Sequence, residues 1–314
     1  MKSMSRKCLY CYEDLNIDED FHSSCCIKFF GSPQPPDLDY SMYEIAKLAK
    51  EVVENSVSVP GVQPKLSLGL ISDFLKDNGR LTILGALGGN FILKPPNETF
   101  SQMPENEHLT MRMAQICGIS VVQSSLIRLK TGELSYITKR IDRTETLEKI
   151  HMLDMFQILE AFDKYKSSME KIGKAVAVYA SNTLLDLLRL FEVTVFSYLT
   201  GNNDMHLKNF SLIQNNEKWD LFPAYDLLNV YLHIPEDTEE MALTINGKKR
   251  KLSKTDFIHL GKKFQLNEKQ IENSFLRFVK AEDKLKSEIK RSFLSLENQS
   301  KYLDLLESRL VIFK

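Results

Sequence analysis

The sequence lacks a strong excess of either charge, a long uncharged hydrophobic run and any internal repeat. Its 314 residues carry 41 basic and 42 acidic side chains, a net charge of −1, so no global attraction to nucleic acid or to an anionic membrane is expected. The most apolar run, residues 183–199, contains Asp186, Arg189 and Glu192. Those charges indicate a buried helix rather than a membrane span. The first basic residues have no apolar stretch behind them, which excludes a secretory signal, so we expect a cytoplasmic protein.

Cysteine is scarce except at the N-terminus. Four of five cysteines lie in the first 26 residues, as C-x2-C followed by His22 and the adjacent pair Cys25-Cys26. In the cytoplasm this pattern favours metal or free thiols over disulfides. Zn²⁺ takes four nitrogen or sulfur ligands, which Cys8, Cys11, His22 and one of Cys25 or Cys26 would supply; we take Cys26 as the fourth. The alternative is a thiol-rich segment that binds no metal.

Hydrophobic periodicity divides the chain into a β-rich first half and a helical second half. Strands are predicted at residues 66–71, 81–86, 90–94, 121–129 and 134–141, with helices at 40–54 and 104–117. Further helices are predicted at 151–162, 168–178, 182–199, 254–264, 267–292 and 297–311. We therefore expect an α+β fold in three parts: a cysteine-containing segment with a proline-rich linker (1–37), a β-rich lobe (38–145) and a helical lobe (146–314).

A polar loop, GNNDMHLKNF (201–210), follows the long apolar helix, and a predicted hairpin then leads to Asp226. Phosphoryl transfer needs a carboxylate that accepts the proton of the attacking hydroxyl, and oxygen ligands that hold Mg²⁺. The interval from Asp204 to Asn209 equals that of the kinase catalytic loop. Asp204 is thus the candidate base, and Asn209 and Asp226 are the candidate metal ligands. The alternative is a polar turn in which Asp and Asn only cap backbone groups.

The strand FILK ends in Lys94, much as the kinase strand V-A-I-K ends in its phosphate-binding lysine. Glu107 on the following predicted helix is the candidate partner, with Glu105 as the alternative. Taken alone, Lys94 would be a surface lysine at a strand end. The upstream stretch SVSVPGVQPKLS (56–67) would cover the phosphates through backbone amides near its glycine. The residues proposed for that loop are Val59, Pro60, Gly61, Val62, Gln63 and Lys65.

These motifs together resemble the HipA-like serine/threonine kinases of bacterial type II toxin–antitoxin systems. The matching segments are SVPGVQPKLSL (58–68), GGNFILKPP (88–96), ENEHLTMRMA (105–114), TKRIDR (138–143), GNNDMHLKNFSL (201–212) and PAYDLLN (223–229). The resemblance implies a two-lobe protein-kinase-like fold that uses ATP and Mg²⁺.

The resemblance also implies roles for single residues. Asp204 would accept the proton, His206 and Asn209 would line the nucleotide and metal site, and Tyr225 with Asp226 would hold metal and phosphate. Lys94 would meet the phosphates. The segment Lys139–Ile141 would meet adenine through backbone groups, with Asp142 toward the ribose. The implied autophosphorylation sites are Ser58 and Ser56, where added negative charge would repel ATP and switch the kinase off.

Only 55 residues precede Ser56, whereas long family members carry many more. The chain therefore resembles the short HipT type, in which a small HipS-like protein supplies the missing subdomain. The implied substrates are aminoacyl-tRNA synthetases, with growth arrest and persistence as the outcome. A HipB-like helix-turn-helix antitoxin would be the partner, and operator DNA would be reached through it.

Two other functions fit parts of the pattern. One is a phosphotransferase that acts on a small-molecule hydroxyl with the same catalytic groups. The other is an inactive kinase-like module that only holds an antitoxin or a DNA complex. The intact set of Asp204, Asn209, Asp226 and Lys94 argues against the inactive module.

Overall fold

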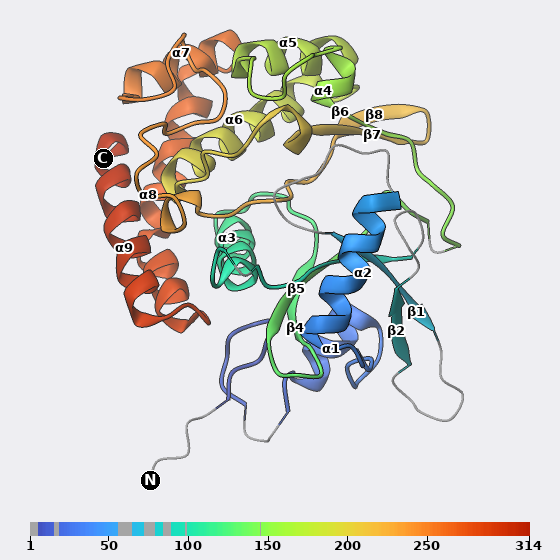
Figure 1. Cartoon of the computed structure of the whole chain (residues 1–314). Helices are drawn as coiled ribbons and strands as arrows, with labels where there is room; N and C mark the ends of the chain where they lie inside the picture. Colours follow the sequence, from blue (N-terminus) through green and yellow to red (C-terminus); the bar gives the residue numbers. More distant parts are fainter. Residues whose placement is uncertain are drawn as a thin grey trace. The chain divides into compact units, whose positions relative to one another are not determined.

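The computed structural model describes residues 6–15, 19–55, 65–71, 79–83, 89–97, 99–144 and 146–314. These residues form two compact units (Figure 1). The first comprises Met1–His108, Val122–Glu148 and Arg291–Phe293, and the second comprises Leu109–Val121, Lys149–Lys290 and Leu294–Lys314. The predicted lobe boundaries at residues 37 and 145 stay predictions.

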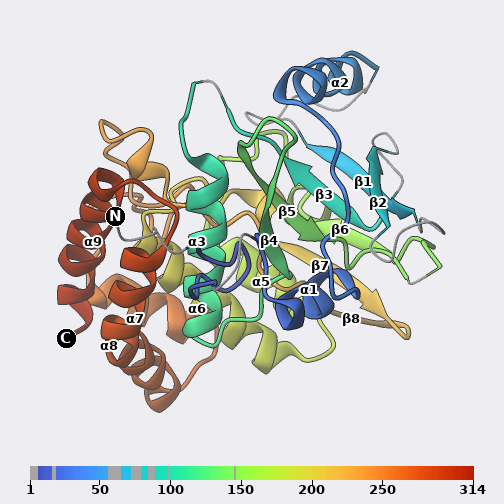
Figure 2. The ribbon, with the colours of Figure 1, turned by 90° about the horizontal axis from the view of Figure 1, so that it is seen from below.

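The first unit is built on a five-stranded antiparallel sheet in the order β2-β1-β3-β5-β4, whose edge strands β2 and β4 stand apart in Figure 2. Its strands are β1 (Leu66–Ile71), β2 (Arg80–Ile83), β3 (Phe91–Lys94), β4 (Ser124–Arg128) and β5 (Leu134–Lys139). Leu66 of β1 pairs with Leu93 of β3, and both side chains are fully buried. The apolar side chains that predicted these strands therefore form the core of this unit.

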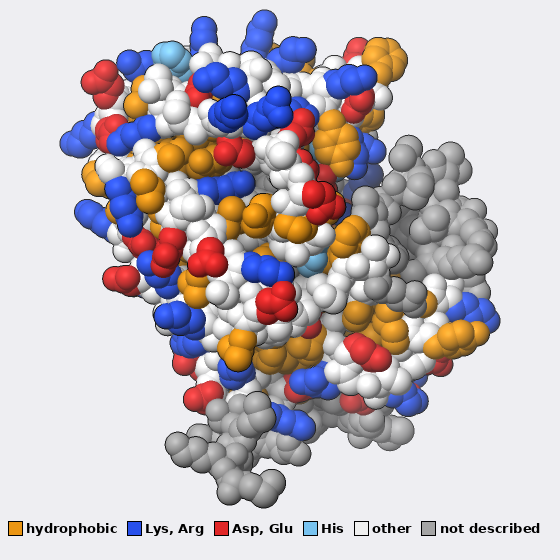
Figure 3. Space-filling model, turned by 60° about the vertical axis from the view of Figure 1, so that its left-hand side comes forward, with side chains coloured by type: hydrophobic (Ala, Val, Ile, Leu, Met, Phe, Trp, Pro, Cys, Tyr) orange, Lys and Arg blue, Asp and Glu red, His pale blue; other side chains and the backbone are white. Residues whose placement is uncertain are grey.

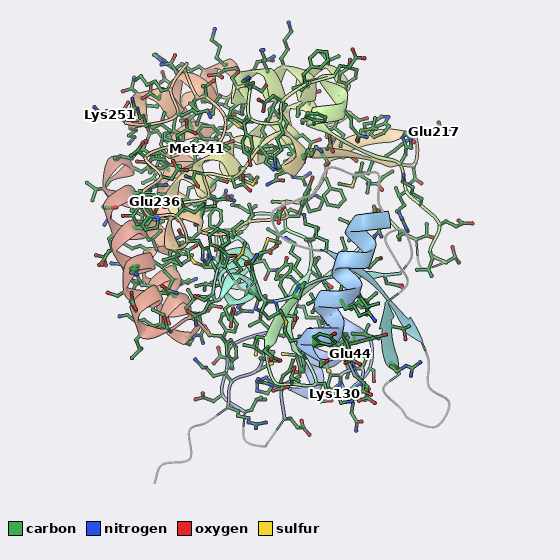
Figure 4. All side chains as sticks on the ribbon, viewed as in Figure 1. Glu44, Lys130, Glu217, Glu236, Met241 and Lys251 are labelled. Carbon is green, nitrogen blue, oxygen red and sulfur yellow. The ribbon has the colours of Figure 1, made fainter. Side chains whose placement is uncertain are left out.

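Helices α1 (Ser23–Phe30) and α2 (Met42–Asn55) belong to this unit, and α3 (Met103–Ile116) begins in it and continues into the second unit from Leu109. The N-terminus of α2 is held at the β4–β5 turn, where the Met42 N–H donates to the Thr131 hydroxyl at 3.1 Å. Figure 4 labels Glu44 of α2 and Lys130 of that turn, which attract one another electrostatically. Helix α1 was not predicted from the sequence. It forms because Phe29 and Phe30 on one face are buried, while Gly31 ends it with φ of 83°.

The second unit is mainly helical, with a small three-stranded sheet in the order β6-β7-β8. Its helices are α4 (Met155–Ile158), α5 (Met169–Tyr179), α6 (Thr183–Thr200), α7 (Lys254–Lys263), α8 (Glu268–Arg291) and α9 (Leu296–Leu310). Its strands are β6 (Met152–Asp154), β7 (Ser211–Asn215) and β8 (Lys218–Leu221). The β7–β8 hairpin turns at Asn216 and Glu217, which both have positive φ, as a two-residue type I′ turn requires. Glu217 marks its tip in Figure 4.

Helix α6 forms the centre of the second unit, because its side chains from Val193 to Thr200 are buried without interruption. It ends at Gly201 with φ of 72°, where a Cβ would lie 2.5 Å from a methyl of Leu305. Glycine therefore meets both a conformational and a steric requirement at the start of the polar loop. Within the described residues, no helix combines the length and the apolar character needed to cross a bilayer.

The helix predicted at residues 151–162 is wrong. Met152–Asp154 instead pairs with β7 as strand β6, and only Met155–Ile158 is helical. Asp154 caps this short helix by accepting from the Gln157 N–H, and the Gln157 side chain accepts from the Asp154 N–H in return. The chain then leaves the helix at Glu160, whose φ is 48°. Strand pairing with a distant segment has overridden the local helical pattern. The remaining elements confirm the predicted α+β class.

Candidate functional site

The first unit holds a buried ion pair between Lys94, at the end of β3, and Glu107 on α3. The Lys94 Nζ lies 2.6 Å from the Glu107 Oε1, and the two side chains are 5% and 2% exposed. The Lys94 ammonium also lies 5.3 Å from the centroid of the Tyr136 ring. Removing one member of such a buried pair costs about 3–5 kcal/mol, since the other charge is left without its partner. The strand-end lysine is therefore not a surface residue, and its partner is the glutamate favoured by the sequence.

Glu105, the alternative partner, has a different environment. Burial raises the pKa of its carboxyl group to about 7, against an ordinary value of 4.5. A carboxyl group with a pKa near 7 is only partly ionised at neutral pH. It is therefore a weaker partner for the Lys94 ammonium than a fully ionised carboxylate. Glu105 and Glu107 lie only two positions apart on α3, yet Glu107 pairs with Lys94 and Glu105 has a raised pKa.

The predicted hinge lies at the end of β5. The Lys139 N–H donates to the Gln123 carbonyl, and the Arg140 N–H donates to the Asn90 carbonyl. The Lys139 side chain packs over the Phe29 ring. In contrast, the backbone groups of Ile141 make no hydrogen bond among the described residues. Ile141 is the hinge residue best placed to offer backbone groups to a ligand.

Asp142 is held by two guanidinium groups. Its carboxylate lies 2.6 Å from Arg140 and 2.7 Å from Arg143, and this pairing lowers its pKa despite the opposing effect of burial. A contact with a ribose would have to share that carboxylate, so this role stays a prediction. The phosphate-covering residues Val59–Gln63 and the predicted phosphorylation sites Ser56 and Ser58 lie outside the described residues. Lys65, immediately before β1, is exposed.

The second unit holds the Asp204 loop. The Asp204 Oδ1 accepts a hydrogen bond of 2.7 Å from the Tyr165 hydroxyl. The Asp204 carbonyl accepts from the His206 N–H at 2.8 Å and from the Asn209 side-chain amide at 3.1 Å. The aspartate and the asparagine are therefore held together by the loop itself. The Asn209 nitrogen donates inward, and its amide oxygen accepts no hydrogen bond within the described chain.

His206 lies between these groups. The Lys164 ammonium donates to the His206 Nε2 at 2.9 Å, which requires a neutral ring with its proton on Nδ1. Burial lowers the pKa of His206, and the carboxylates of Asp204 and Asp226 oppose that shift. His206 is only 7% exposed, and its Nδ1 has no partner among the described residues. A buried donor without a partner marks a place where a ligand or water completes the hydrogen bonding.

Tyr225 and Asp226 lie shortly after β8, the second strand of the β7–β8 hairpin. The Tyr225 hydroxyl donates to the Lys208 carbonyl and accepts from the Ser211 hydroxyl, both at 2.7 Å. Tyr225 therefore ties the segment before Asp226 to the Asp204 loop and to β7. Asp226 has φ of 60°, a left-handed conformation that non-glycine residues rarely adopt. Such local strain persists where surrounding contacts fix it, often at functional sites.

These residues fit a nucleotide and a divalent cation. Carboxylate and amide oxygens are the ligands that Mg²⁺ prefers, and Asp204, Asn209 and Asp226 supply that set within one unit. Both carboxylates oppose the lowering of the His206 pKa, so each acts electrostatically on the same ring. Asn202 is completely buried, and both polar atoms of its side chain lack a partner in the described part of the chain. This second set of unsatisfied groups also points to a missing ligand or water.

The N-terminal segment brings Cys8, Cys11 and His22 together with Cys25 rather than with Cys26, which corrects our choice of the fourth residue. Cys26, the next residue along α1, is fully buried and is not part of this group. Hydrogen bonds from the Cys11 side chain and from backbone N–H groups lower the pKa of Cys8 to about 4. The Cys8 thiol is thus the one that ionises most readily.

Sequence reasoning missed Lys164 and Tyr165, which contact His206 and Asp204 respectively. The Tyr165 ring also meets the His206 ring edge-on, with centroids 5.2 Å apart. Both residues lie between α4 and α5, where the only signal was a short polar and aromatic stretch, DKYK (163–166). Nothing in their spacing from the Asp204 loop could have identified them.

Comparison with known proteins supports one family. The HipA-like C-terminal domain matches residues 57–285. The "Putative kinase Y4dM" of Sinorhizobium fredii is 34% identical to the chain over 77% of its length. A "Putative kinase" of Haemophilus influenzae is 27% identical over 82% of its length. The chain spans 60% and 82% of those two relatives. A serine/threonine-protein kinase toxin HipA of Shewanella oneidensis is 27% identical over 61% of the chain, which spans 47% of that relative.

Two solved structures share the fold. The Shewanella oneidensis toxin–antitoxin complex of HipA, HipB and operator DNA contains a chain that superimposes with a TM-score of 0.65 at 19% identity, covering 84% of this chain and 70% of that one. The proinflammatory kinase CtkA of Helicobacter pylori gives a TM-score of 0.53 at 16% identity, covering 73% and 90%. These likenesses confirm the predicted kinase-like α+β fold. Because the family match covers well over half of the sequence, the chain belongs to the HipA-like C-terminal domain family.

Proposed function

We propose that this protein is an ATP-dependent serine/threonine protein kinase. In this proposal the β-rich part, residues 38–145, holds the phosphates through Lys94. The helical part, residues 146–314, carries the proton acceptor Asp204 and the metal ligands Asn209 and Asp226. The Asp204 loop carries the proposal, because it gathers a carboxylate, an amide oxygen and a buried donor without a partner among the described residues, all within six positions.

Each group has one chemical task. Mg²⁺ bound to ATP neutralises charge on the phosphates and helps to position them. Asp204 orients the incoming hydroxyl and accepts its proton, while Tyr165 fixes the carboxylate through one oxygen. His206 is a donor to the nucleotide through Nδ1, and Lys164 fixes the tautomer that makes this donation available. Lys94, steadied by Glu107, binds phosphate oxygens.

Transfer of labelled phosphate from ATP tests this function directly. Wild-type protein is incubated with radiolabelled ATP, Mg²⁺ and candidate protein substrates, and Asp204→Asn is measured beside it. Asp220→Asn is the matched control, since Asp220 lies on β8 and binds Asn182 at the surface. We expect Asp204→Asn to lose transfer by about 10²-fold or more and Asp220→Asn to retain it. Equal transfer by both variants would contradict the role of Asp204, and label only on small molecules would favour the small-molecule phosphotransferase.

The finer proposal is a toxin kinase of the short HipT type that acts in the cytoplasm. Its substrate is a serine of an aminoacyl-tRNA synthetase, and it modifies itself at Ser58 or Ser56. The name of the Shewanella oneidensis relative, a serine/threonine-protein kinase toxin, supports the toxin part of this proposal. Phosphoproteome measurement after brief induction tests the target: a synthetase serine should gain phosphate before growth stops. A growth arrest without any new synthetase phosphosite would reject that target class.

A HipB-like antitoxin is the proposed partner, and a small HipS-like protein is a second one. Operator DNA is proposed to be reached only through the antitoxin. The net charge of −1 supports indirect binding, and so does the mixture of basic and acidic side chains over the face in Figure 3. Purified chain alone should therefore show only weak, salt-sensitive DNA binding in a mobility-shift assay. Tight binding by the isolated chain would contradict this arrangement.

A further inference from the structure

The N-terminal segment contains a cluster of four groups that the kinase chemistry does not use. The thiols of Cys8, Cys11 and Cys25 and one ring nitrogen of His22 all lie within 4.8 Å of one another. They come from two short pairs, C-x2-C and H-x2-C, that are ten residues apart in sequence. Among the described residues, no other three cysteine, histidine or acidic side chains bring their ligand atoms this close together. Their convergence in a segment this small is therefore a specific feature of the fold.

The distances within the cluster match a zinc site. With zinc bonds of about 2.3 Å to sulfur and 2.0–2.1 Å to nitrogen, a tetrahedron places sulfur and nitrogen about 3.6 Å apart. The His22 Nδ1 lies 3.4 Å from the Cys11 sulfur and 3.9 Å from the Cys25 sulfur. A single Nδ1 lone pair cannot serve two thiols fully as a hydrogen-bond acceptor. A cation placed between them would satisfy the nitrogen and both sulfurs at once.

The histidine is oriented for this purpose. Its other ring nitrogen, Nε2, lies 3.1 Å from the Asp14 carbonyl, so Nε2 carries the proton and donates it to that oxygen. Nδ1 is then the unprotonated nitrogen and faces the sulfurs. A metal-binding histidine commonly has its second nitrogen held by a carbonyl or carboxylate in this way. The cluster therefore has the outer support that distinguishes a built site from an accidental group of thiols.

The backbone around the cluster is also arranged for coordination. Cys8 and Cys11 flank a tight turn, closed by the Tyr12 N–H that donates to the Cys8 carbonyl at 3.0 Å. Tyr12 has φ of 65°, so a large side chain occupies the left-handed region directly after the second cysteine. His22 is the N-cap of α1, and Cys25 lies in the first turn of that helix. One turn and one helix start thus present two ligands each.

We propose that Cys8, Cys11, His22 and Cys25 bind one structural Zn²⁺. Protein groups occupy all four positions, so the site is closed and has no place for a substrate or an activated water. A disulfide is the competing chemistry for a C-x2-C pair, but it would leave Cys25 and the oriented His22 without a function. Softer sulfur and nitrogen ligands also exclude Mg²⁺, which prefers oxygen.

The proposed zinc site would fix a segment that leads to the Lys94–Glu107 pair. The Leu126 N–H donates to the Leu9 carbonyl at 3.2 Å, which attaches the turn to β4. The Tyr12 hydroxyl lies 3.0 Å from the His108 Nδ1, and His108 is the neighbour of Glu107 on α3. All of these residues belong to the first unit. The site would thus act as a positioning device for the N-terminal half of α3.

Metal content of the purified full chain tests the proposal. We expect one zinc per chain by mass spectrometry, with no zinc added during purification. Two neighbouring cysteines give a matched pair: Cys25→Ser should lose the zinc, whereas Cys26→Ser should keep it, since Cys26 is not among the four groups that converge. Equal zinc content in the two variants would overturn the proposed ligand set.

A second measurement separates loss of metal from loss of folding. His22→Cys should keep one zinc as a four-cysteine site, while His22→Ala should lose it. Reconstitution of the metal-stripped wild type with Co²⁺ should give the thiolate charge-transfer and d–d absorption of a tetrahedral site. Failure to bind either metal, or isolation of the native chain with Cys8 and Cys11 joined as a disulfide, would reject the zinc site. None of these readouts depends on kinase activity.

Discussion

Two clusters of metal-binding residue types lie in the two units of this protein, and their chemistry differs. The cluster at Cys8, Cys11, His22 and Cys25 offers sulfur and imidazole nitrogen. The cluster around Asp204 offers carboxylate and amide oxygens, with a buried imidazole beside them. Both arise from short sequence spacings, yet the first suits a soft ion held permanently, and the second suits a hard ion that arrives with its ligand.

The two clusters differ in how many of their ligand atoms already have partners, and this distinguishes a structural metal site from a catalytic one. In the sulfur cluster every candidate ligand faces the others, and the histidine is fixed by the Asp14 carbonyl. In the oxygen cluster the Asn209 oxygen and the His206 Nδ1 remain without partners among the described residues. A closed set stabilises the fold, whereas an incomplete set leaves positions for substrate. The two clusters should therefore respond to metal and mutation in opposite ways.

The largest effect should come from the oxygen cluster. Asp226→Asn removes a proposed Mg²⁺ ligand and should lower phosphoryl transfer by about 10³-fold, since charge stabilisation on the phosphates is lost. Zinc content should stay at one per chain. Titration with ATP in the presence and absence of Mg²⁺ provides the control, because only the Mg²⁺-dependent part of the affinity should fall. Loss of metal-free ATP binding instead would indicate a folding defect.

Removal of zinc should lower the stability of the fold and change phosphoryl transfer only slightly. A thiol-reactive agent or strong chelator that strips the sulfur cluster should lower the melting temperature by about 5–10 °C, which corresponds to about 3 kcal/mol of lost stability. Transfer activity at 25 °C should fall by less than about tenfold, because no proposed catalytic group touches the zinc. Calorimetry and the phosphotransfer assay measure the two quantities on one sample. If stripping zinc abolished activity without any change in melting, the structural assignment would be wrong.

Glu105, which lies outside both clusters, shows how a single buried carboxyl group makes the stability of the fold depend on pH. Burial raises the pKa of Glu105 to about 7 in the folded chain from about 4.5, so the folded state binds its proton more tightly. Stability contributed by this protonated group is complete below pH 4.5 and is lost as pH rises through 7. Glu105→Gln should therefore gain about 1–3 kcal/mol at pH 8 and nothing at pH 4.5. Denaturant titrations at both pH values measure this change.

Glu107→Gln serves as the opposite control for that experiment. It breaks the buried pair with Lys94 and should destabilise the protein by about 3 kcal/mol at pH 8. A gain in stability from Glu107→Gln at pH 8 would show that the Lys94–Glu107 ion pair does not stabilise the folded chain.

The smallest effect should come from the link between the sulfur cluster and α3. Tyr12→Phe removes the hydroxyl that meets His108 and should cost about 1 kcal/mol, while zinc content stays unchanged. Affinity for ATP should fall by about twofold to fivefold, because the Lys94–Glu107 pair loses support from one side only. Isothermal titration measures the affinity. Unchanged affinity would confine the influence of the sulfur cluster to stability.

Much of the fold followed from the sequence because its signals are local. Alternating leucines predicted β1, and the continuous apolar pattern of α6 predicted a buried helix that ends at Gly201. The pairing of Lys94 with Glu107 was predicted from their places on a strand end and a helix. The helix predicted at 151–162 failed, since its first residues had a strand partner, β7, nearly sixty positions away.

The sequence by itself determined which residue types were present for each kind of chemistry: thiols near the N-terminus, carboxylates and amides after α6, and a lysine at the end of β3. Tertiary structure alone decided which of them meet. The fold places Cys25, and not Cys26, beside Cys8, because adjacent side chains on a helix point in different directions. It also brought Tyr165 and Lys164 to the Asp204 loop, since packing joins segments whose separation in sequence carries no periodic signal.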